Sequence, residues 1–152
     1  MSFLQIACMD TLVNTDTRLV VELRHSRAIA PRKANSSDAC FDLASPTALR
    51  IPVGATQAVD LGLAIELEPG WEAQIRGRSG LASRGIVVHQ GTIDHLYRQN
   101  LKVLIHNLSG SVFTIEPGDR IAQMKIGKVY TVDLEIGRVT PTERGGLGST
   151  GR

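Results

Sequence analysis

The sequence predicts an all-β protein, built as a sandwich or barrel of short strands. Val, Ile and Leu recur in short runs that turn signals separate, while patterns typical of helices are scarce. The tripeptide Glu-Pro-Gly occurs twice between such runs, at Glu68–Gly70 and Glu116–Gly118. Proline presets φ at the first central turn position and glycine accepts a positive φ at the second, so both tripeptides predict type II turns.

The apolar runs give the order of the expected strands. These are Arg18–Arg24, Thr47–Pro52, Thr56–Asp60, Ala64–Glu68, Glu72–Arg76, Gly85–Val88, Leu101–His106, Ser111–Glu116, Arg120–Ile126 and Val129–Ile136. Between two of them, the segment Gly91–Arg98 predicts a hairpin. The stretch Ser79–Ser83 is the one place in the middle of the chain where a short helical turn is expected.

Chain length and composition predict one domain with a distinct tail. The 152 residues are 42% hydrophobic and 21% charged, which is ordinary globular usage and sufficient for one core. From Pro141 onward the sequence is rich in glycine and has almost nothing to bury. We therefore expect a β domain over residues 1–139 and a mobile C-terminal arm over residues 140–152.

Several classes of protein are disfavoured. No apolar run approaches the ~20 residues of a spanning helix, and the N-terminal residues do not form a secretory signal. Cys8 and Cys40 are too few for a disulfide framework or a zinc site. A net charge of +2 is too small to predict direct nucleic-acid binding. We expect a soluble intracellular protein that binds neither membrane nor nucleic acid directly, in the cytoplasm, or in the nucleus of a eukaryotic or virus-infected cell.

Familiar catalytic motifs are excluded by spacing. Gly80 and Gly85 resemble the start of a Walker A loop, but Ile86 stands where its lysine belongs. Ser79 does not lie in a Gly-x-Ser-x-Gly elbow. The four histidines show no His-x-x-x-His spacing for a metal site.

Four polar segments remain as candidates for a site. Gly77–Gly80 combines backbone N–H groups, a hydroxyl and a guanidinium, which suit phosphate oxygens, although such a turn is more often only a loop. The tail after Pro141 carries a second set of groups that suit phosphate oxygens, and its alternative is an unstructured end. For the hairpin, the alternative is that Asp94 is only a turn residue and Tyr97 only packs. For Asp42, the alternative is a residue at the start of a strand with no further role.

Taken in order, these segments resemble the five motifs of the trimeric dUTPase family. The matching segments are Ala39-Cys40-Phe41-Asp42-Leu43, Gly77-Arg78-Ser79-Gly80-Leu81-Ala82, Gly91-Thr92-Ile93-Asp94 with Tyr97-Arg98, Gly118-Asp119-Arg120-Ile121-Ala122-Gln123, and Arg144-Gly145 with Gly148-Ser149-Thr150-Gly151. Each match alone is modest. Five in sequence, over nearly the whole chain, are specific.

The resemblance implies a fold, an assembly and a reaction. It implies a jelly-roll-like β subunit with a glycine-rich C-terminal arm, and a homotrimer whose sites are shared between subunits. It implies magnesium-dependent hydrolysis of dUTP to dUMP and pyrophosphate, which keeps uracil out of DNA and supplies dUMP for dTMP synthesis. The tail would act as a lid.

The resemblance also assigns roles to residues. Asp94 would be the general base, Asp42 would act on Mg²⁺ through water, and Tyr97 would pack under the deoxyribose. The substrate-binding set would be Arg78, Ser79, Gly80, Gly91, Thr92, Ile93, Tyr97, Gln123, Arg144, Leu147, Gly148, Ser149 and Thr150.

The sequence departs from the family pattern at a few positions, and two alternatives stay open. Cys40 replaces a glycine, His95-Leu96 a more polar pair, and Gln99 another glycine. The tail motif is two residues shorter than the common form, with Leu147 where a phenylalanine usually stacks on uracil. The alternatives are a trimer that binds dUTP or a protein partner with reduced turnover, and a nucleotide enzyme like the dCTP deaminases.

Overall fold

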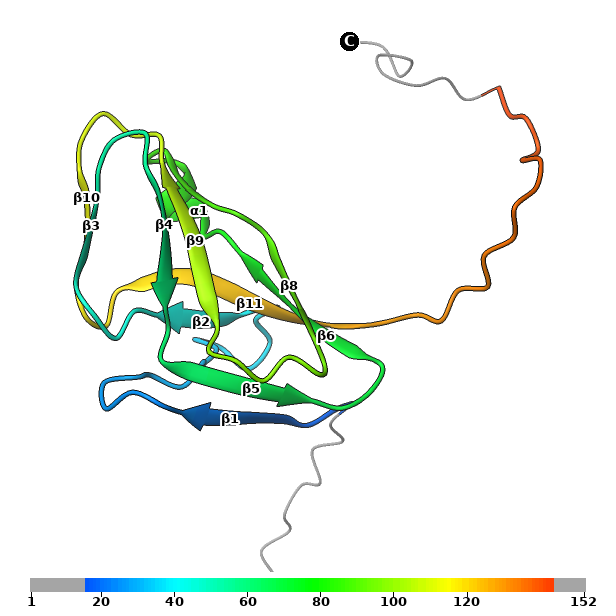
Figure 1. Ribbon diagram of the computed structural model, residues 1–152, viewed down its shortest axis with the longest axis horizontal. Helices are drawn as coiled ribbons and strands as arrows, with labels where there is room; N and C mark the ends of the chain where they lie inside the picture. The colour runs from blue at the N-terminus through cyan, green and yellow to red at the C-terminus, as the bar shows by residue number, and fades with distance from the viewer. Residues whose placement is uncertain (1–15, 144–152) are drawn as a thin grey trace, which may run out of the picture.

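The computed structural model describes residues 16–143, and over this range the regular secondary structure is almost entirely β (Figure 1). The strands are β1 (Leu19–Leu23), β2 (Phe41–Ala44), β3 (Leu49–Ile51), β4 (Thr56–Asp60), β5 (Leu63–Leu67), β6 (Trp71–Arg76), β7 (Ile86–Val88), β8 (Gly91–Asp94), β9 (Lys102–Asn107), β10 (Phe113–Ile115) and β11 (Arg120–Lys128). A single helical turn, α1 (Ser79–Ala82), follows β6. The predicted all-β class is confirmed.

Two larger sheets and two ribbons form the jelly-roll-like body. One sheet has the strand order β2-β11-β6-β8 and the other β4-β9-β7, while β1 pairs with β5 and β10 with β3. Every pairing is antiparallel. One apolar cluster draws on nearly all the strands, and its largest fully buried members are Leu43, Ile51, Leu61, Leu63, Ile75, Ile86, Leu101, Val103, Ile105, Ile115, Ile121 and Met124. The two sheets and the two ribbons therefore share one hydrophobic core.

A buried asparagine fixes one end of the body. Asn107 is fully buried, and its side-chain amide donates to the carbonyl oxygens of Ile51 (2.9 Å) and Ser111 (2.8 Å). Its Oδ1 accepts from the backbone N–H of Ser109 at 3.0 Å and from the Ser109 hydroxyl at 2.7 Å. The side chain therefore joins the end of β9 to β3 and to the loop before β10.

Both predicted type II turns have the expected backbone. Gly70 has φ 86° and Gly118 has φ 94°, values that favour glycine. The closing bonds run from Trp71 N–H to the Glu68 carbonyl (3.3 Å) and from Asp119 N–H to the Glu116 carbonyl (3.0 Å). These turns connect β5 to β6 and β10 to β11.

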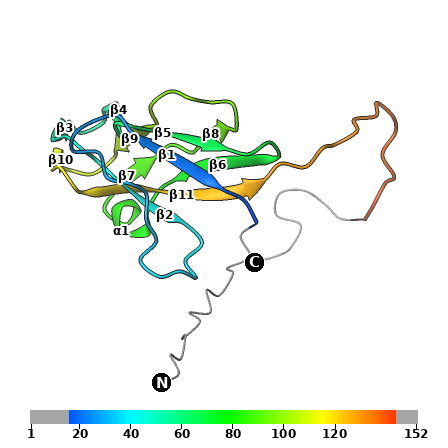
Figure 2. The same ribbon diagram turned by 90° about the horizontal axis from the view of Figure 1, so that it is seen from below.

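The predicted strand positions are largely confirmed, with one error and two omissions. Thr56–Asp60 matches β4, and the other correct strands differ from the structure by a few residues at their ends. The short strands β2 and β8 were not among the predicted runs. The predicted strand Val129–Ile136 is wrong, because no strand lies beyond Lys128 in the described residues. The chain there leaves the body as an exposed extended segment, on the side away from α1 (Figures 1 and 2).

Within residues 16–143, no helix is long and apolar enough to cross a membrane.

Candidate active site

A cluster of one aspartate and two arginines lies at the junction of β2, α1 and β11. Asp42 on β2 forms ion pairs with both guanidinium groups: its Oδ1 lies 3.2 Å from Arg78 Nε, and its Oδ2 accepts a hydrogen bond from Arg120 Nη1 at 3.0 Å. Arg78 Nη1 also donates to the Arg120 carbonyl at 2.8 Å. Only 20% of the Asp42 side chain is exposed, so the carboxylate is positioned to hold the two cations side by side.

Two features fix the backbone around this cluster: a β-bulge in β11 and the side-chain amide of Gln123. The register between β11 and β2 shifts between Arg120 and Ala122, so an extra residue of β11 stands opposite β2 there. Gln123 is paired with both Asp42 and Arg76 across the sheet, and its Nε2 donates to the Gly77 carbonyl at 2.7 Å. Gln123 thus holds the loop that carries Arg78.

The segment Gly77–Gly80 is confirmed as the start of a helical turn, although the turn is short. Arg78 precedes α1 with extended backbone angles, and α1 has only four residues. The groups of this segment that could contact an anion are therefore the guanidinium of Arg78 and the exposed Ser79 and Gly80, since a turn this short has little helix dipole.

An open hollow of about 460 Å³ adjoins the cluster. Its walls carry three guanidinium groups and one aromatic ring, and the lining residues are Arg78, Leu81, Arg84, Phe113, Thr114, Gly118, Asp119, Arg120 and Ile121. The Arg84 guanidinium carbon lies 5.9 Å from the centre of the Phe113 ring. Arg84 and Arg120 were absent from the predicted binding set. Arg120 lies within the fourth motif, whereas only the fold places Arg84 beside Arg78.

The predicted hairpin lies at the edge of the same sheet as the cluster. β8 pairs with β6 on one side only, so part of the backbone of Gly91–Ile93 faces outward without a strand partner among the described residues. Asp94 is exposed at the end of β8. The Tyr97 hydroxyl donates to the Asn100 carbonyl at 3.0 Å, and 36% of this residue is exposed.

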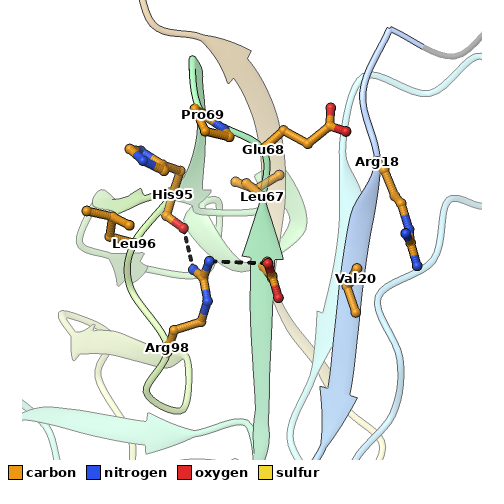
Figure 3. Close-up of a pocket in the computed structure, with 9 residues that line it drawn as sticks. Arg18, Val20, Leu67, Glu68, Pro69, His95, Leu96 and Arg98 are labelled. Carbon is orange, nitrogen blue, oxygen red and sulfur yellow. Dashed lines mark hydrogen bonds and ion pairs between the residues drawn. The ribbon is translucent and has the colours of Figure 1, made fainter.

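Arg98 anchors the hairpin to the body (Figure 3). One of its guanidinium nitrogens donates to the His95 carbonyl, and the other lies 3.5 Å from Glu66 Oε1 on β5. Its own carbonyl accepts from Arg24 at 2.8 Å. These contacts fix the turn that follows Asp94.

One chain keeps the two halves of the predicted site apart. Gln123 on β11 lies opposite both Asp42 on β2 and Arg76 on β6. Asp94 lies on β8, the strand next to β6, and is opposite Glu72, four residues along β6 from Arg76. With strands ~4.8 Å apart and ~3.4 Å per residue, Asp94 is about 20 Å from Asp42. The structure therefore brings Asp42, Arg78 and Gln123 together but leaves the hairpin separate.

The remaining predicted residues lie outside the described range. These are Arg144, Leu147, Gly148, Ser149 and Thr150.

The cluster offers one carboxylate for a metal ion. In the described part of the chain, no group of three or more His, Cys, Asp or Glu side chains could hold a metal. Mg²⁺ is commonly held by one or two carboxylates together with phosphate oxygens and waters. Both oxygens of Asp42 are already paired with guanidinium groups, so Asp42 could contact such an ion through water.

The fold and the cluster together define a class of protein: an all-β domain with an arginine-rich surface suited to a polyanionic ligand. A sequence model of the dUTPase family matches residues 11–151. The deoxyuridine 5'-triphosphate nucleotidohydrolase of Wolinella succinogenes is 42% identical over 134 residues, which cover 84% of this chain and 90% of that protein. The protein of the same name from Neorickettsia sennetsu is 46% identical over 129 residues, covering 80% and 87%.

Solved structures agree with these sequence relatives. The dUTPase of Staphylococcus bacteriophage 80alpha with dUPNHPP aligns with a TM-score of 0.82 at 25% identity, over 88% of this chain and 98% of that chain. A mutant dUTPase from phage phi11 of S. aureus, whose structure describes a structural Mg(II) ion, aligns with a TM-score of 0.73 at 22% identity, over 80% and 97%. This chain belongs to the dUTPase family, and the resemblance read from its five motifs is confirmed.

Proposed function

We propose that this protein hydrolyses dUTP to dUMP and pyrophosphate. Family membership over residues 11–151 and the names of its relatives support the reaction. The observation in this chain that carries the proposal is the pair Arg78 and Arg120, fixed by Asp42 beside the hollow. A triphosphate is the polyanion that such an arrangement would bind.

Arg78, Arg84 and Arg120 would bind phosphate oxygens in the hollow. Phosphoryl transfer depends mainly on positioning and on stabilising charge on those oxygens, so fixed guanidinium groups lower the barrier. Asp42 holds Arg78 and Arg120 in place before substrate arrives. Less of the binding energy is then lost in ordering the two side chains.

Asp94 would draw a proton from the attacking water, and Tyr97 would pack under the deoxyribose. Asp94 is exposed in the single chain and so is free to meet a substrate held elsewhere. The outward backbone of Gly91–Ile93 would pair with the uracil edge. Cytosine would place donors against donors there, at about 1–3 kcal/mol for each unpaired group.

Mg²⁺ is the proposed cofactor, with Asp42 as its contact through water. When bound with the triphosphate, the ion supplies positive charge that offsets the charge on the phosphate oxygens. The lid role of residues 140–152, including Arg144, Leu147, Gly148, Ser149 and Thr150, also remains part of this proposal.

We also propose a homotrimer in which the hairpin of one subunit completes the site of another. The separation of about 20 Å between Asp94 and Asp42, from strand spacing, leaves a single chain without a complete site. The segment after β11 supports association, since Tyr130, Val132, Leu134 and Ile136 alternate along it and are each at least 78% exposed. A stable, fully active monomer in sedimentation velocity would contradict this assembly.

The test of the function is pyrophosphate release from dUTP with Mg²⁺, with dCTP, dTTP and UTP as control substrates. We expect turnover of dUTP alone. Saturable dUTP binding without pyrophosphate release would favour the regulatory alternative. Conversion of dCTP to dUTP would favour the deaminase alternative.

A further inference from the structure

Two histidines lie together on the outer face of the sheet β4-β9-β7. On β9, His106 lies opposite Thr56 of β4 and Val87 of β7. His89 directly follows β7, and its backbone N–H donates to the Leu104 carbonyl at 2.9 Å. Because alternate residues share a face of a strand, His89 and His106 lie diagonally to each other on adjacent chain segments.

The two rings are close, and one of them is oriented by a hydrogen bond. Their centroids are 6.3 Å apart, with an angle of 81° between the ring planes. The Thr56 hydroxyl lies 2.6 Å from His106 Nδ1. With Nδ1 engaged, Nε2 is the nitrogen of His106 that remains for a ligand. Histidines that bind metals usually have their second nitrogen held in this way.

We propose that His89 and His106 bind one transition-metal cation of the class that imidazole prefers, such as Zn²⁺, Ni²⁺ or Cu²⁺. A Zn–N bond is about 2.0–2.1 Å, so two rings on one ion place their centroids on the order of 5–6 Å apart. For both rings to bind one ion, the His89 ring must rotate out of the observed edge-to-face arrangement and move slightly closer to the His106 ring. His89 is exposed, so its side chain has room for this rotation.

The site is distinct from the proposed magnesium position in its chemistry. Mg²⁺ prefers several oxygen ligands, and the groups facing this site are two imidazoles and the Thr56 hydroxyl that His106 already engages, beside the apolar Val87 and Leu104. No third His, Cys, Asp or Glu completes a group with them in residues 16–143. Water therefore fills the other coordination positions, and the affinity is below that of a closed four-ligand site.

A cation bound here would lie next to the segment that leads into the hairpin. His89 lies two residues before Gly91, where β8 begins, and His106 lies on the strand that follows the hairpin. An ion bound to both histidines would fix the segment leading into the hairpin against β9. This consequence for Asp94 rests on the proposed function, whereas the binding of the cation does not.

The test is isothermal titration of the metal-free, untagged full chain with Zn²⁺, repeated with Ni²⁺. We expect one ion per chain, and at least a tenfold rise in Kd for His89→Gln and for His106→Gln. The matched controls His25→Gln and Cys40→Ser should bind as the parent does. Thr56→Val should weaken binding and Thr56→Ser should restore it, because the hydroxyl orients the ring.

Two results would overturn the proposal. One is the absence of saturable Zn²⁺ or Ni²⁺ binding by the parent chain. The other is parental affinity in both histidine variants, which would leave the rings as an aromatic pair only. dUTP turnover with Mg²⁺ should be unchanged in His89→Gln without added Zn²⁺, so loss of cation binding is separable from failure of the proposed function.

Discussion

Replacing Arg120 with glutamine tests whether the second arginine of the cluster binds substrate. Its Nη1 lies 3.0 Å from Asp42, and its side chain is 50% exposed. A hydrogen bond to a charged group contributes about 1.5–3 kcal/mol, and half exposure places a phosphate contact near the lower end. A loss of about 1.5 kcal/mol corresponds to roughly a tenfold rise in KM for dUTP. The kcat should change less, since Asp94 is untouched.

The assay is steady-state pyrophosphate release at low and high ionic strength. Lys125→Gln is the matched control, since it removes one positive charge from an exposed position on the same strand. We expect the KM difference to shrink as salt screens the lost charge. Equal KM values for Arg120→Gln and Lys125→Gln at low salt would refute the assignment of Arg120 to phosphate binding.

Five further changes test the remaining assignments. Asp94→Asn should lower kcat by on the order of 10²–10⁴ with little change in dUTP affinity, and parental turnover would show that Asp94 is not the base. Deleting residues 140–152 should leave the ligand-free melting temperature unchanged but abolish stabilisation by a non-hydrolysable dUTP analogue; a large drop without ligand would make the tail structural. Leu147→Phe should lower KM up to roughly tenfold if residue 147 reaches the base, since stacking contributes about 1–3 kcal/mol, and Leu147→Ala should raise it. Parental kinetics in Leu147→Ala would remove it from the site. Asn107→Leu should cost about 3–5 kcal/mol in urea unfolding, because it leaves several buried groups unpaired, and a loss below 1 kcal/mol would contradict this reading of the contacts.

Much of the fold could be predicted because its signals are local. The Pro-Gly pairs at residues 69–70 and 117–118 predict turns through the φ angles that these residues favour. The apolar runs on either side of each turn are then predicted as a pair of strands that it connects. β2 and β8 escaped prediction because neither is an apolar run: β2 has the sequence Phe-Asp-Leu-Ala and β8 has the sequence Gly-Thr-Ile-Asp. Residues 129–136 show the opposite failure. Their alternation is typical of a strand, but a strand also needs a partner, and the chain supplies none in its described part.

The site was only partly predictable because its contacts are long-range. Asp42 and Arg120 are 78 positions apart, and only the pairing of β2 with β11 brings them together. Arg78 and Asp94 are close in sequence, yet β6 and β8 carry them to different ends of the sheet. Motif order predicted candidate residues, and the structure brings three of them together, namely Asp42, Arg78 and Gln123. Motif order could not predict that one carboxylate would hold two guanidinium groups.

The apolar residues on the extended segment have a consequence for how stability is measured. Ile136 is 96% exposed and Leu134 is 80% exposed in the single chain, so association would bury surface that folding alone leaves in water. The free energy of unfolding of the proposed trimer then depends on protein concentration, and a tenfold dilution removes about 1.4 kcal/mol for each association step. Melting temperatures of variants are therefore comparable only at one protomer concentration. A substitution at Leu134 or Ile136 should lower the melting temperature of a dilute sample more than that of a concentrated one.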